Sequence, residues 1–330
     1  MRAINEVFAR IGGRRSTSRE VARPFVFQHE NVLGTSLELR LVAADERCAL
    51  QAEAAALAEI DRLCLILSGY SGTSEFARWQ TTRNEDVEVS PELAEVLESA
   101  EAWRIRTNGA FNPGVKAVAD LLRGAADFAS AGVESSAILS ELQVPLWRVD
   151  RNASRATRLT ALAVSLDAIA KGYIVHRAAA RASAVPGVAD VLLNIGGDIQ
   201  HFGDTPVVAG IANPFAPSEN VPPIATVRIH NEALATSGGY RRGFSGGGEW
   251  HSHIIDPYTR RPANGIVSAS VVAPDGATAD ALSTAFSVLE PSEAVALAES
   301  FDGISCLMID EGGTLHSNAA WRRRAVEIVA

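Results

Sequence analysis

The chain has 330 residues, 47% of them hydrophobic, so it can bury one large core or two subdomains that share an interface. Its formal net charge of −9 argues against a broad nucleic-acid-binding surface and against an anionic-membrane surface. Any phosphate group that it binds must be held locally.

The cysteines and the N-terminal region indicate in which cellular compartment the protein is expected. Cys48, Cys64 and Cys306 are odd in number and far apart, which predicts core thiols in a reducing compartment rather than disulfides or a metal knuckle. The N-terminal arginines are not followed by the apolar run that a secretion signal requires. No segment approaches the roughly 20 consecutive apolar residues of a membrane helix. We expect a cytoplasmic protein with a flexible arm over 1–24 and a single domain over 25–330.

The N-terminal half of the chain combines a strand pair with three helices. Alternating apolar residues predict paired strands over 25–42, broken at Gly34, where a bulge or a close backbone approach is expected. Apolar periodicity and the cap sequence Ser90-Pro91-Glu92 predict helices over 43–67, 91–106 and 115–128. A tight loop over 108–114 separates the last two.

The C-terminal half alternates short strands with helices. Strands are predicted over 147–150, 159–166, 191–195, 207–211, 225–229, 253–255, 267–272 and 304–309. Helices are predicted over 167–184, 277–289 and 292–300. Because the two kinds of element are interleaved irregularly and no short repeat is present, the sequence predicts a mixed, layered α+β fold.

The helix predicted over 277–289 carries a candidate metal site. Asp280 and Thr284 are four residues apart, so they share a face of the helix away from Leu282 and Phe286. A carboxylate and a hydroxyl on one face are half of a magnesium site. The alternative is purely structural: an acid that interacts with the helix dipole and a threonine that bonds back to a carbonyl.

Two further segments offer groups for an anion. Lys171 lies in the first turn of a predicted helix, where the ammonium and the backbone N–H groups can hold a phosphate together, and the alternative is a solvated lysine. Gly196-Gly197-Asp198 follows a buried strand and exposes N–H groups without a Cβ, or forms a plain turn. The segment 235–240 adds two hydroxyls and two glycines, or is a surface turn.

The segment 250–259 contains the histidines of interest. His251 and His253 would share one face of an extended strand, as a zinc pair does, but no third soft ligand follows nearby. A single histidine acting as a general base beside a magnesium site fits the sequence better.

Taken in order, these segments resemble the ApbE-type flavin transferases, FAD:protein FMN transferases, over Leu33 to Leu289. The matching pieces are Leu33-Gly34-Thr35, Ser68-Gly-Tyr70 with Ser74-Glu75, Gly109-Ala-Phe-Asn-Pro113, Ile169-Ala-Lys-Gly172-Tyr173, Asn194-Ile-Gly-Gly-Asp198, Ala235-Thr-Ser-Gly238 with Tyr240, His253-Ile-Ile-Asp-Pro257 with Thr259, and Ala279-Asp-Ala-Leu-Ser-Thr284. Each piece alone is a weak match, whereas eight in register are a strong one.

The resemblance implies a T-fold-like, two-subdomain architecture around a flavin cleft. It implies an enzyme that takes FAD as substrate with Mg²⁺, attaches FMN through its phosphate to a Thr or Ser of an acceptor flavoprotein, and releases AMP. The implied metal ligands are Asp280, Thr284 and the backbone carbonyl of Ala168, and the implied base is His253. The implied flavin contacts are Leu33, Tyr70, Ala110, Phe111, Asn112, Ser165, Lys171 and Ile254.

Three positions depart from the family's pattern. Asn112 stands in place of an aspartate, Ser165-Leu-Asp167-Ala168 replaces Asp-Leu-Gly-Gly as if a carboxylate had moved two places, and Arg260 replaces a glycine. Two alternatives to the transferase follow. One is an FAD pyrophosphatase, in which water replaces the acceptor hydroxyl, and the other is a flavin-binding protein whose chemistry has lapsed through the changes at Asn112 and Ser165.

Overall fold

The computed structural model describes residues 22–124, 138, 140–216, 221–239, 243–246 and 249–326, with the backbone alone for 244–246 and 249–251. Most of the predicted arm lies outside the described residues. The first strand, β1, begins at Arg23, two residues before the expected domain boundary. Among the described residues, no helix combines the length and the hydropathy that a bilayer crossing requires.

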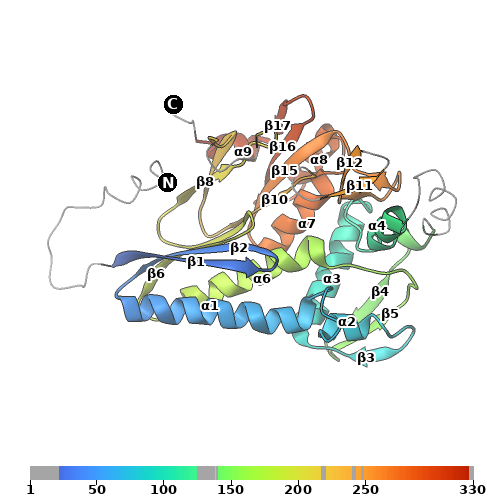
Figure 1. Ribbon diagram of the computed structural model, residues 1–330, viewed down its shortest axis with the longest axis horizontal. Coiled ribbons are helices and arrows are strands. Elements are labelled where there is room, and N and C mark those ends of the chain that lie inside the picture. Colours follow the sequence, from blue (N-terminus) through green and yellow to red (C-terminus); the bar gives the residue numbers. More distant parts are fainter. Residues whose placement is uncertain are drawn as a thin grey trace.

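An eight-stranded antiparallel sheet forms the centre of the molecule (Figure 1). Its order is β1 (Arg23–Val32), β2 (Thr35–Ala43), β6 (Val188–Ile195), β7 (Asp198–Gly203), β10 (Ala233–Ser237), β15 (Ile266–Ala273), β16 (Ser305–Asp310) and β17 (Leu315–Ser317). Alternation decides which face is buried: Leu37, Leu39 and Leu41 of β2 are at most 2% exposed, and the residues between them are not.

Helices cover one face of this sheet (Figure 1). They are α1 (Glu46–Leu67), α6 (Asp167–Ser183) and α7 (Gly276–Phe286), which pack against one another and against the central strands. The opposite face is covered by the hairpin of β8 (Val207–Ile211) and β9 (Ala225–Ile229) together with α9 (Ala319–Arg324), around the buried Trp321. The molecule is thus layered on both sides of the sheet.

A smaller subdomain lies at one end of the layers (Figure 1). Its three-stranded sheet, β3 (Asp86–Glu88), β5 (Arg155–Arg158) and β4 (Trp147–Asp150), is accompanied by α2 (Glu75–Trp79), α3 (Pro91–Arg106) and α4 (Val115–Gly124). The remaining elements are the pairs β11 (Gly243–Gly246) with β12 (Glu249–Ser252) and β13 (Ile255–Asp256) with β14 (Arg261–Pro262), and α8 (Pro291–Glu299).

Several predicted elements are confirmed and others are corrected. Helix α3 has its predicted bounds, because Ser90 accepts from Leu93 N and Pro91 fits the first turn. The strand predicted over 159–166 is wrong: the partner of β4 is β5, which ends at Arg158. The Arg158 guanidinium then donates to the carbonyls of Ala161 and Leu162, so the chain curls around this side chain instead of continuing the sheet. Strands β7 and β10 were not predicted.

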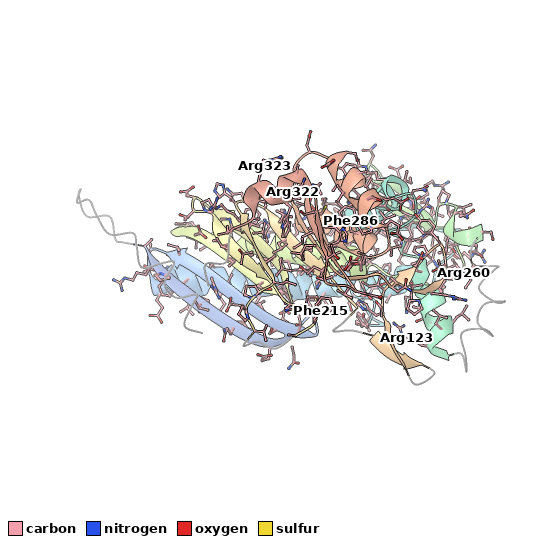
Figure 2. The ribbon with its side chains drawn as sticks, turned by 90° about the horizontal axis from the view of Figure 1, so that it is seen from above. Arg123, Phe215, Arg260, Phe286, Arg322 and Arg323 are labelled. Atoms are coloured by element: carbon pink, nitrogen blue, oxygen red, sulfur yellow. The ribbon has the colours of Figure 1, made fainter. Side chains whose placement is uncertain are left out.

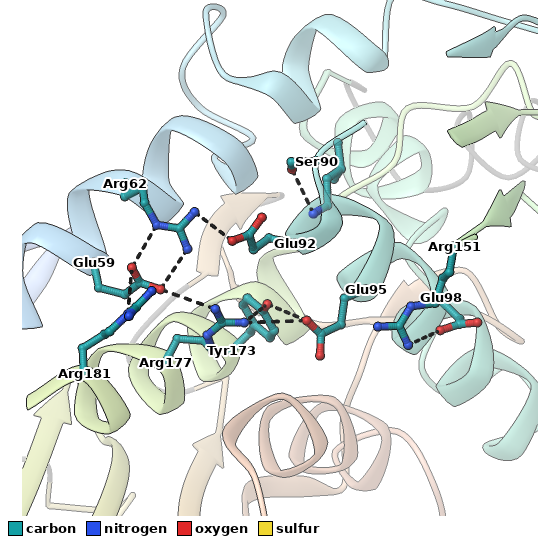
Figure 3. Close-up of polar contacts among 11 residues, drawn as sticks. Glu59, Arg62, Ser90, Glu92, Glu95, Glu98, Arg151, Tyr173, Arg177 and Arg181 are labelled. Atoms are coloured by element: carbon teal, nitrogen blue, oxygen red, sulfur yellow. Dashed lines mark hydrogen bonds and ion pairs between the residues drawn. The ribbon is translucent and has the colours of Figure 1, made fainter. Parts of the chain in front are cut away.

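An ion-pair network around the buried Glu59 joins α1, α3 and α6 (Figure 3). Glu59, 4% exposed, lies 2.9 Å from Arg62 Nε, 3.8 Å from Arg177 Nη2 and 3.6 Å from Arg181 Nε. Arg62 also pairs with Glu92 of α3 at 2.8 Å. The hydrogen bonds from Arg62 lower the pKa of the Glu59 carboxyl in spite of its burial. This carboxylate is balanced by its neighbours.

The position of side chains relative to the layers is visible from above (Figure 2). Phe286, at the end of α7, is fully buried within the body of the molecule, whereas Arg322 and Arg323 on α9 are exposed. Most residues of α7 are buried, so this helix does not present a polar face to solvent. Asp280 is buried together with the apolar residues of the helix.

Candidate functional site

The site is built where α6 and α7 cross. A Cβ placed on Gly172 would lie 2.0 Å from the carbonyl oxygen of Gly276, so the two backbones touch and no side chain fits between them. Asp280 follows Gly276 by one helical turn, and its Oδ2 accepts a hydrogen bond of 3.0 Å from Gly172 N. The contact of two glycines thus carries the α7 carboxylate to the first turns of α6.

This crossing also brings Ala168 close to Asp280. In a regular helix, the N–H of Gly172 points at the carbonyl of Ala168, about 3 Å away. Because the same N–H lies 3.0 Å from Asp280 Oδ2, the two oxygens are within about 6 Å of each other. Thr284 lies one turn beyond Asp280 on α7. The crossing thus places Asp280 next to the first turns of α6, and the spacing along α7 puts Thr284 on the same face as Asp280.

The charges around Asp280 are unbalanced. Asp280 is 5% exposed, and burial together with the negative charge of Asp198 raises the pKa of its carboxyl to about 8. Lys171 lies opposite, with its Nζ 2.8 Å from Asp198 Oδ2. The Asp167 carboxylate acts in the same direction as Asp198. If Asp280 is ionised, one ammonium therefore faces three carboxylates, two of which, Asp280 and Asp198, are buried.

These residues fit a magnesium ion. Among the described residues, no three His, Cys, Asp or Glu side chains are grouped as a cage made by protein alone would need. Mg²⁺ is usually held by one or two carboxylates plus water and substrate phosphates. The donors here are all oxygen atoms, and the negative charge exceeds what Lys171 neutralises. A divalent cation would restore the balance.

A cluster of hydroxyls surrounds Thr284. Ser237 Oγ, at the end of β10, lies 2.8 Å from Ser283 Oγ and 3.2 Å from Thr284 Oγ1. Ser283 Oγ in turn donates to the carbonyl of Asp280 at 2.9 Å. Ser237 and Asp198 were absent from the predicted site, although both lie in segments that the sequence marked as glycine-rich turns. Their positions along the chain gave no sign that Asp198 would lie near Asp280 or that Ser237 would contact Thr284.

His253 lies in the bend between β12 and β13. A Cβ on Gly239, two residues after Ser237, would lie 2.6 Å from Ser252 Oγ, so the end of β10 packs directly on the residue before His253. Ile254 is 8% exposed, and its carbonyl accepts from Ala263 N at 2.8 Å. These contacts place the backbone around His253 next to the segment that follows β10. Tyr240 and the side chain of His251 lie outside the described residues.

The turn after His253 keeps the backbone conformation that favours glycine. Arg260 has φ +58°, in the left-handed region, and its N–H donates to the carbonyl of Asp256 at 2.8 Å. An arginine there costs roughly 1 to 2 kcal/mol relative to glycine. Arg260 thus occupies the left-handed conformation in which a glycine would be unstrained.

The loop containing Ala110, Phe111 and Asn112 is buried, and its side chains hold the loop itself. Asn112 Oδ1 accepts from Gly114 N and its Nδ2 donates to the Leu142 carbonyl, both at 3.0 Å. An ionised aspartate has no donor for the second bond. The hydrogen bonds within the loop therefore explain an asparagine at this position. Both the oxygen and the nitrogen of its side-chain amide are already hydrogen-bonded.

Other predicted flavin contacts border this loop and the first turn of α6. Ser165 N donates to the Pro113 carbonyl at 3.0 Å, and Ser165 Oγ accepts from Asp167 N at 3.0 Å. Tyr70, 86% exposed, donates its hydroxyl to Asp167 Oδ2 at 2.9 Å. The relocated carboxylate of Asp167 thus faces Tyr70 and not the position of Ser165.

Leu33 sits in the β1–β2 turn with φ +51°, beside the turn at Gly196 and Gly197. A Cβ on Gly196 would lie 2.5 Å from Thr35 Cγ2, and Gly196 N donates to the Ser36 carbonyl at 3.1 Å. The glycine is required here by both its positive φ and this close approach. No described contact joins Leu33 to Asp280 directly. The β1–β2 turn contacts Gly196, and Asp198, two residues further on, lies near Asp280.

Fold and site together define a layered α+β protein with an oxygen-lined, electronegative centre at a helix crossing. Residues 33–308 match the model of the ApbE family. The chain belongs to the ApbE family, as the eight segments predicted.

Relatives and solved structures agree with this assignment. The FAD:protein FMN transferase of Rhodobacter capsulatus is 30% identical over 309 residues, covering 91% of this chain but only 58% of that relative. Those of Haemophilus influenzae and Treponema pallidum are each 30% identical, over 78% and 90% of this chain and 78% and 86% of their own lengths. The crystal structure of the ApbE protein of Thermotoga maritima has a TM-score of 0.81 at 27% identity, covering 92% of this chain and 100% of its own. The predicted fold class is confirmed.

Proposed function

We propose that this protein is a magnesium-dependent FAD:protein FMN transferase. The observation that carries the proposal is the buried, electronegative centre at the α6–α7 crossing, where Asp280 lies within hydrogen-bonding distance of the α6 backbone. Membership of the ApbE family and the activity by which the relatives are named support the same reaction.

Asp280, Thr284 and the Ala168 carbonyl would hold the magnesium ion. When bound there, Mg²⁺ supplies positive charge to the diphosphate of FAD during phosphoryl transfer. Ser237 fixes the hydroxyl of Thr284 through the 3.2 Å contact, so the ligand is oriented before the ion arrives. Asp198 holds the Lys171 ammonium at the edge of the same centre.

The remaining residues bind and orient the two substrates. Lys171 would contact the diphosphate from the first turns of α6, where the helix N-terminus also favours negative charge. The flavin would lie against Leu33, Tyr70, Ser165, the buried loop 110–112 and the backbone of Ile254. Since the amide of Asn112 is engaged within its loop, we expect its contact to be made by the backbone.

His253 is the proposed base. It would take the proton from the hydroxyl of a Thr or Ser of the acceptor flavoprotein while that oxygen attacks the FMN phosphorus. The bond from this phosphorus to the bridging oxygen breaks, and AMP leaves with that oxygen. Phosphoryl transfer by in-line attack requires little covalent chemistry from the protein. We therefore expect these side chains to position the substrates and to stabilise the charge on the transferred phosphoryl group.

One assay separates the transferase from its alternatives. The protein is incubated with FAD, with and without Mg²⁺ and with and without a candidate acceptor, and AMP is quantified while flavin fluorescence is recorded in a denaturing gel. A covalent fluorescent band and acceptor-dependent AMP support the transferase. AMP and FMN formed without acceptor indicate the pyrophosphatase, and bound FAD without AMP under every condition indicates lapsed chemistry.

A further inference from the structure

A tyrosine side chain joins the turn after His253 to the end of α3. Tyr258 donates its hydroxyl to the carbonyl of Asn108 at 2.9 Å, although the two residues are 150 positions apart in the chain. Tyr258 lies between Pro257 and Thr259 and is not among the residues that match the family's pattern. This contact is therefore a feature that the resemblance does not supply.

The acceptor of this hydrogen bond belongs to a well-defined helix end. Asn108 has φ +53°, and its N–H donates to the Ile105 carbonyl at 3.0 Å. The Gly109 N–H donates to the Arg104 carbonyl at 2.8 Å. These two bonds form the Schellman motif, with asparagine in the left-handed position. The Asn108 carbonyl is thus held in place just before the buried loop 110–112.

The turn that carries Tyr258 is closed by one carboxylate. Asp256 Oδ1 accepts from Tyr258 N at 2.7 Å, and its Oδ2 accepts from the Thr259 hydroxyl at 2.8 Å. Asp256 also pairs with Arg261 in the β13–β14 ladder. Because these bonds fix the backbone of the turn, the hydrogen bond made by the Tyr258 hydroxyl also restrains strand β13.

Strand β13 directly follows the residue proposed as the base. Ile254 N donates to Ser252 Oγ at 3.1 Å, and the Ile254 carbonyl accepts from Ala263 N at 2.8 Å, so the backbone on both sides of His253 is held. Ile255 is 3% exposed and packs into the small apolar cluster around α4. Apolar packing is non-directional, whereas a hydrogen bond requires a defined distance and angle. The Tyr258 hydroxyl therefore adds an orientation that the packing of Ile255 leaves open.

The Tyr258 hydroxyl remains a donor in neutral solution. Partial burial, followed by the negative charges of Asp256 and Glu293, raises the pKa of this phenol above its ordinary value of 10.0. The proton that Asn108 accepts is therefore present throughout the neutral pH range.

We propose that Tyr258 is a positioning residue for His253: its hydrogen bond to Asn108 holds the segment 252–263 against the end of α3 and so fixes the backbone of the base relative to the loop 110–112. The inference rests on the proposed function and adds a residue to it. His253 has a contact of its own, so Tyr258 acts on the backbone that carries the imidazole and not on its torsions. Misplacing a catalytic group by about 1 Å can cost as much as about 10²-fold in rate.

The test is a double-mutant cycle of Tyr258→Phe with His253→Ala. The rate of FMN transfer is measured at saturating FAD and Mg²⁺, with the acceptor that forms the fluorescent band in the assay described above. We expect Tyr258→Phe to slow transfer about 3- to 10-fold, the size of one net hydrogen bond, with KM for FAD unchanged. In the His253→Ala background the same change should have no further effect, because the position of a missing base no longer matters.

Hydrogen exchange measures the contact without catalysis. In Tyr258→Phe the amides of Arg260 and Ala263 should exchange about 3- to 10-fold faster, while those of the central strand β6 keep the wild-type rate.

A matched control removes a similar hydrogen bond far from the site. The Thr226 hydroxyl, on β9 at the opposite face of the sheet, donates to the Val326 carbonyl at 2.6 Å. Thr226→Val also deletes one hydroxyl that joins two distant segments, and it should leave the transfer rate within about 2-fold of the wild type.

The outcomes separate this inference from the proposed function. Equal rate factors in the two backgrounds of the cycle, or unchanged exchange in Tyr258→Phe, would overturn the inference and leave the transferase intact. Wild-type protein that forms no covalent flavin with FAD and Mg²⁺ refutes the transferase. Faster exchange in Tyr258→Phe would then assign the hydrogen bond to stability alone, which also overturns the positioning role.

Discussion

Two buried carboxylates in this molecule have opposite surroundings. Glu59 and Asp280 are 4% and 5% exposed, and each comes from a helix packed against α6. Three arginines lie within 4 Å of Glu59, and the pKa of its carboxyl is lowered. Asp280 has Asp198 and Asp167 as negative neighbours against Lys171, and the pKa of its carboxyl is raised.

We interpret the difference as that between a structural carboxylate, Glu59, and the carboxylate that we propose to be a metal ligand, Asp280. A buried charge is stable when it is paired and hydrogen-bonded, as Glu59 is. The surplus of negative charge at Asp280 is unfavourable in the protein alone and becomes favourable when a cation is bound. Burial of a carboxylate therefore does not by itself indicate a functional site. A buried carboxylate whose charge is not balanced by its neighbours is a candidate for one.

The largest expected effect is that of Asp280→Asn. This variant keeps the shape of the side chain but removes the charge, so we expect AMP release from FAD to fall by about 10³-fold or more, since several kcal/mol of charge stabilisation are lost and 1.36 kcal/mol is tenfold. Calorimetric titration should show magnesium affinity lost while FAD binding without metal is retained. Wild-type magnesium affinity in this variant would contradict the assignment of the ligand.

His253→Ala separates proton transfer from charge balance. We expect transfer to the acceptor to slow by roughly 10²-fold, because the acceptor hydroxyl loses its base. Calorimetry should give unchanged affinities for magnesium and FAD, unlike the result for Asp280→Asn. A full transfer rate in this variant would remove His253 from the mechanism.

Glu59→Gln tests the role of the carboxylate whose charge is balanced by arginines. The variant removes the charge that Arg62, Arg177 and Arg181 share, but these arginines are 30–59% exposed, and Arg62 and Arg177 keep Glu92 and Glu95 as neighbours. We therefore expect the free energy of unfolding to fall by about 2 kcal/mol, the value of a hydrogen bond to a charged group. Urea denaturation measures this loss. At a temperature where the variant is still folded, magnesium affinity should match that of the wild type, and a large loss of affinity would mean that the two carboxylates do not act independently.

The pH dependence of stability should differ between the two carboxylates. With EDTA present, a carboxyl whose pKa is raised from 3.8 to about 8 holds its proton in the folded state, so stability falls as the pH rises through this interval. The slope is at most about 1.4 kcal/mol per pH unit, the value for one proton. Glu59, with its lowered pKa, contributes stability above its ordinary value of 4.5 and loses it only in acid.

Thermal melts between pH 5 and pH 9 measure this slope. Saturating Mg²⁺ should flatten it, because the ion binds the ionised form of Asp280, and Asp280→Asn should flatten it without metal. A slope that persists in Asp280→Asn would assign the titration to another group.

Local sequence predicted many of the elements and the family. Cap residues and apolar periodicity gave α3 its bounds, and alternation gave β1 and β2, since these signals act within one or two turns or a single strand. The prediction failed at 159–166, where the Arg158 side chain ends the sheet through contacts that no periodicity encodes. Strands β7 and β10 were missed because β7 directly follows Gly196-Gly197 and β10 ends in Thr236-Ser237 before Gly238-Gly239, and such residues are typical of turns.

The sequence by itself determined the family and predicted which residues would carry the proposed chemistry: Asp280 and Thr284 by helical spacing, and the expected flavin contacts by resemblance to one family. Only the tertiary structure decided what they meet. The contact of Gly172 with Gly276 brings Asp280 to α6, Asp198 pairs with Lys171, and Asp167 accepts a hydrogen bond from Tyr70. Spacing within a helix follows from its fixed geometry, whereas contacts across about 100 residues depend on how whole layers pack, which no local pattern records.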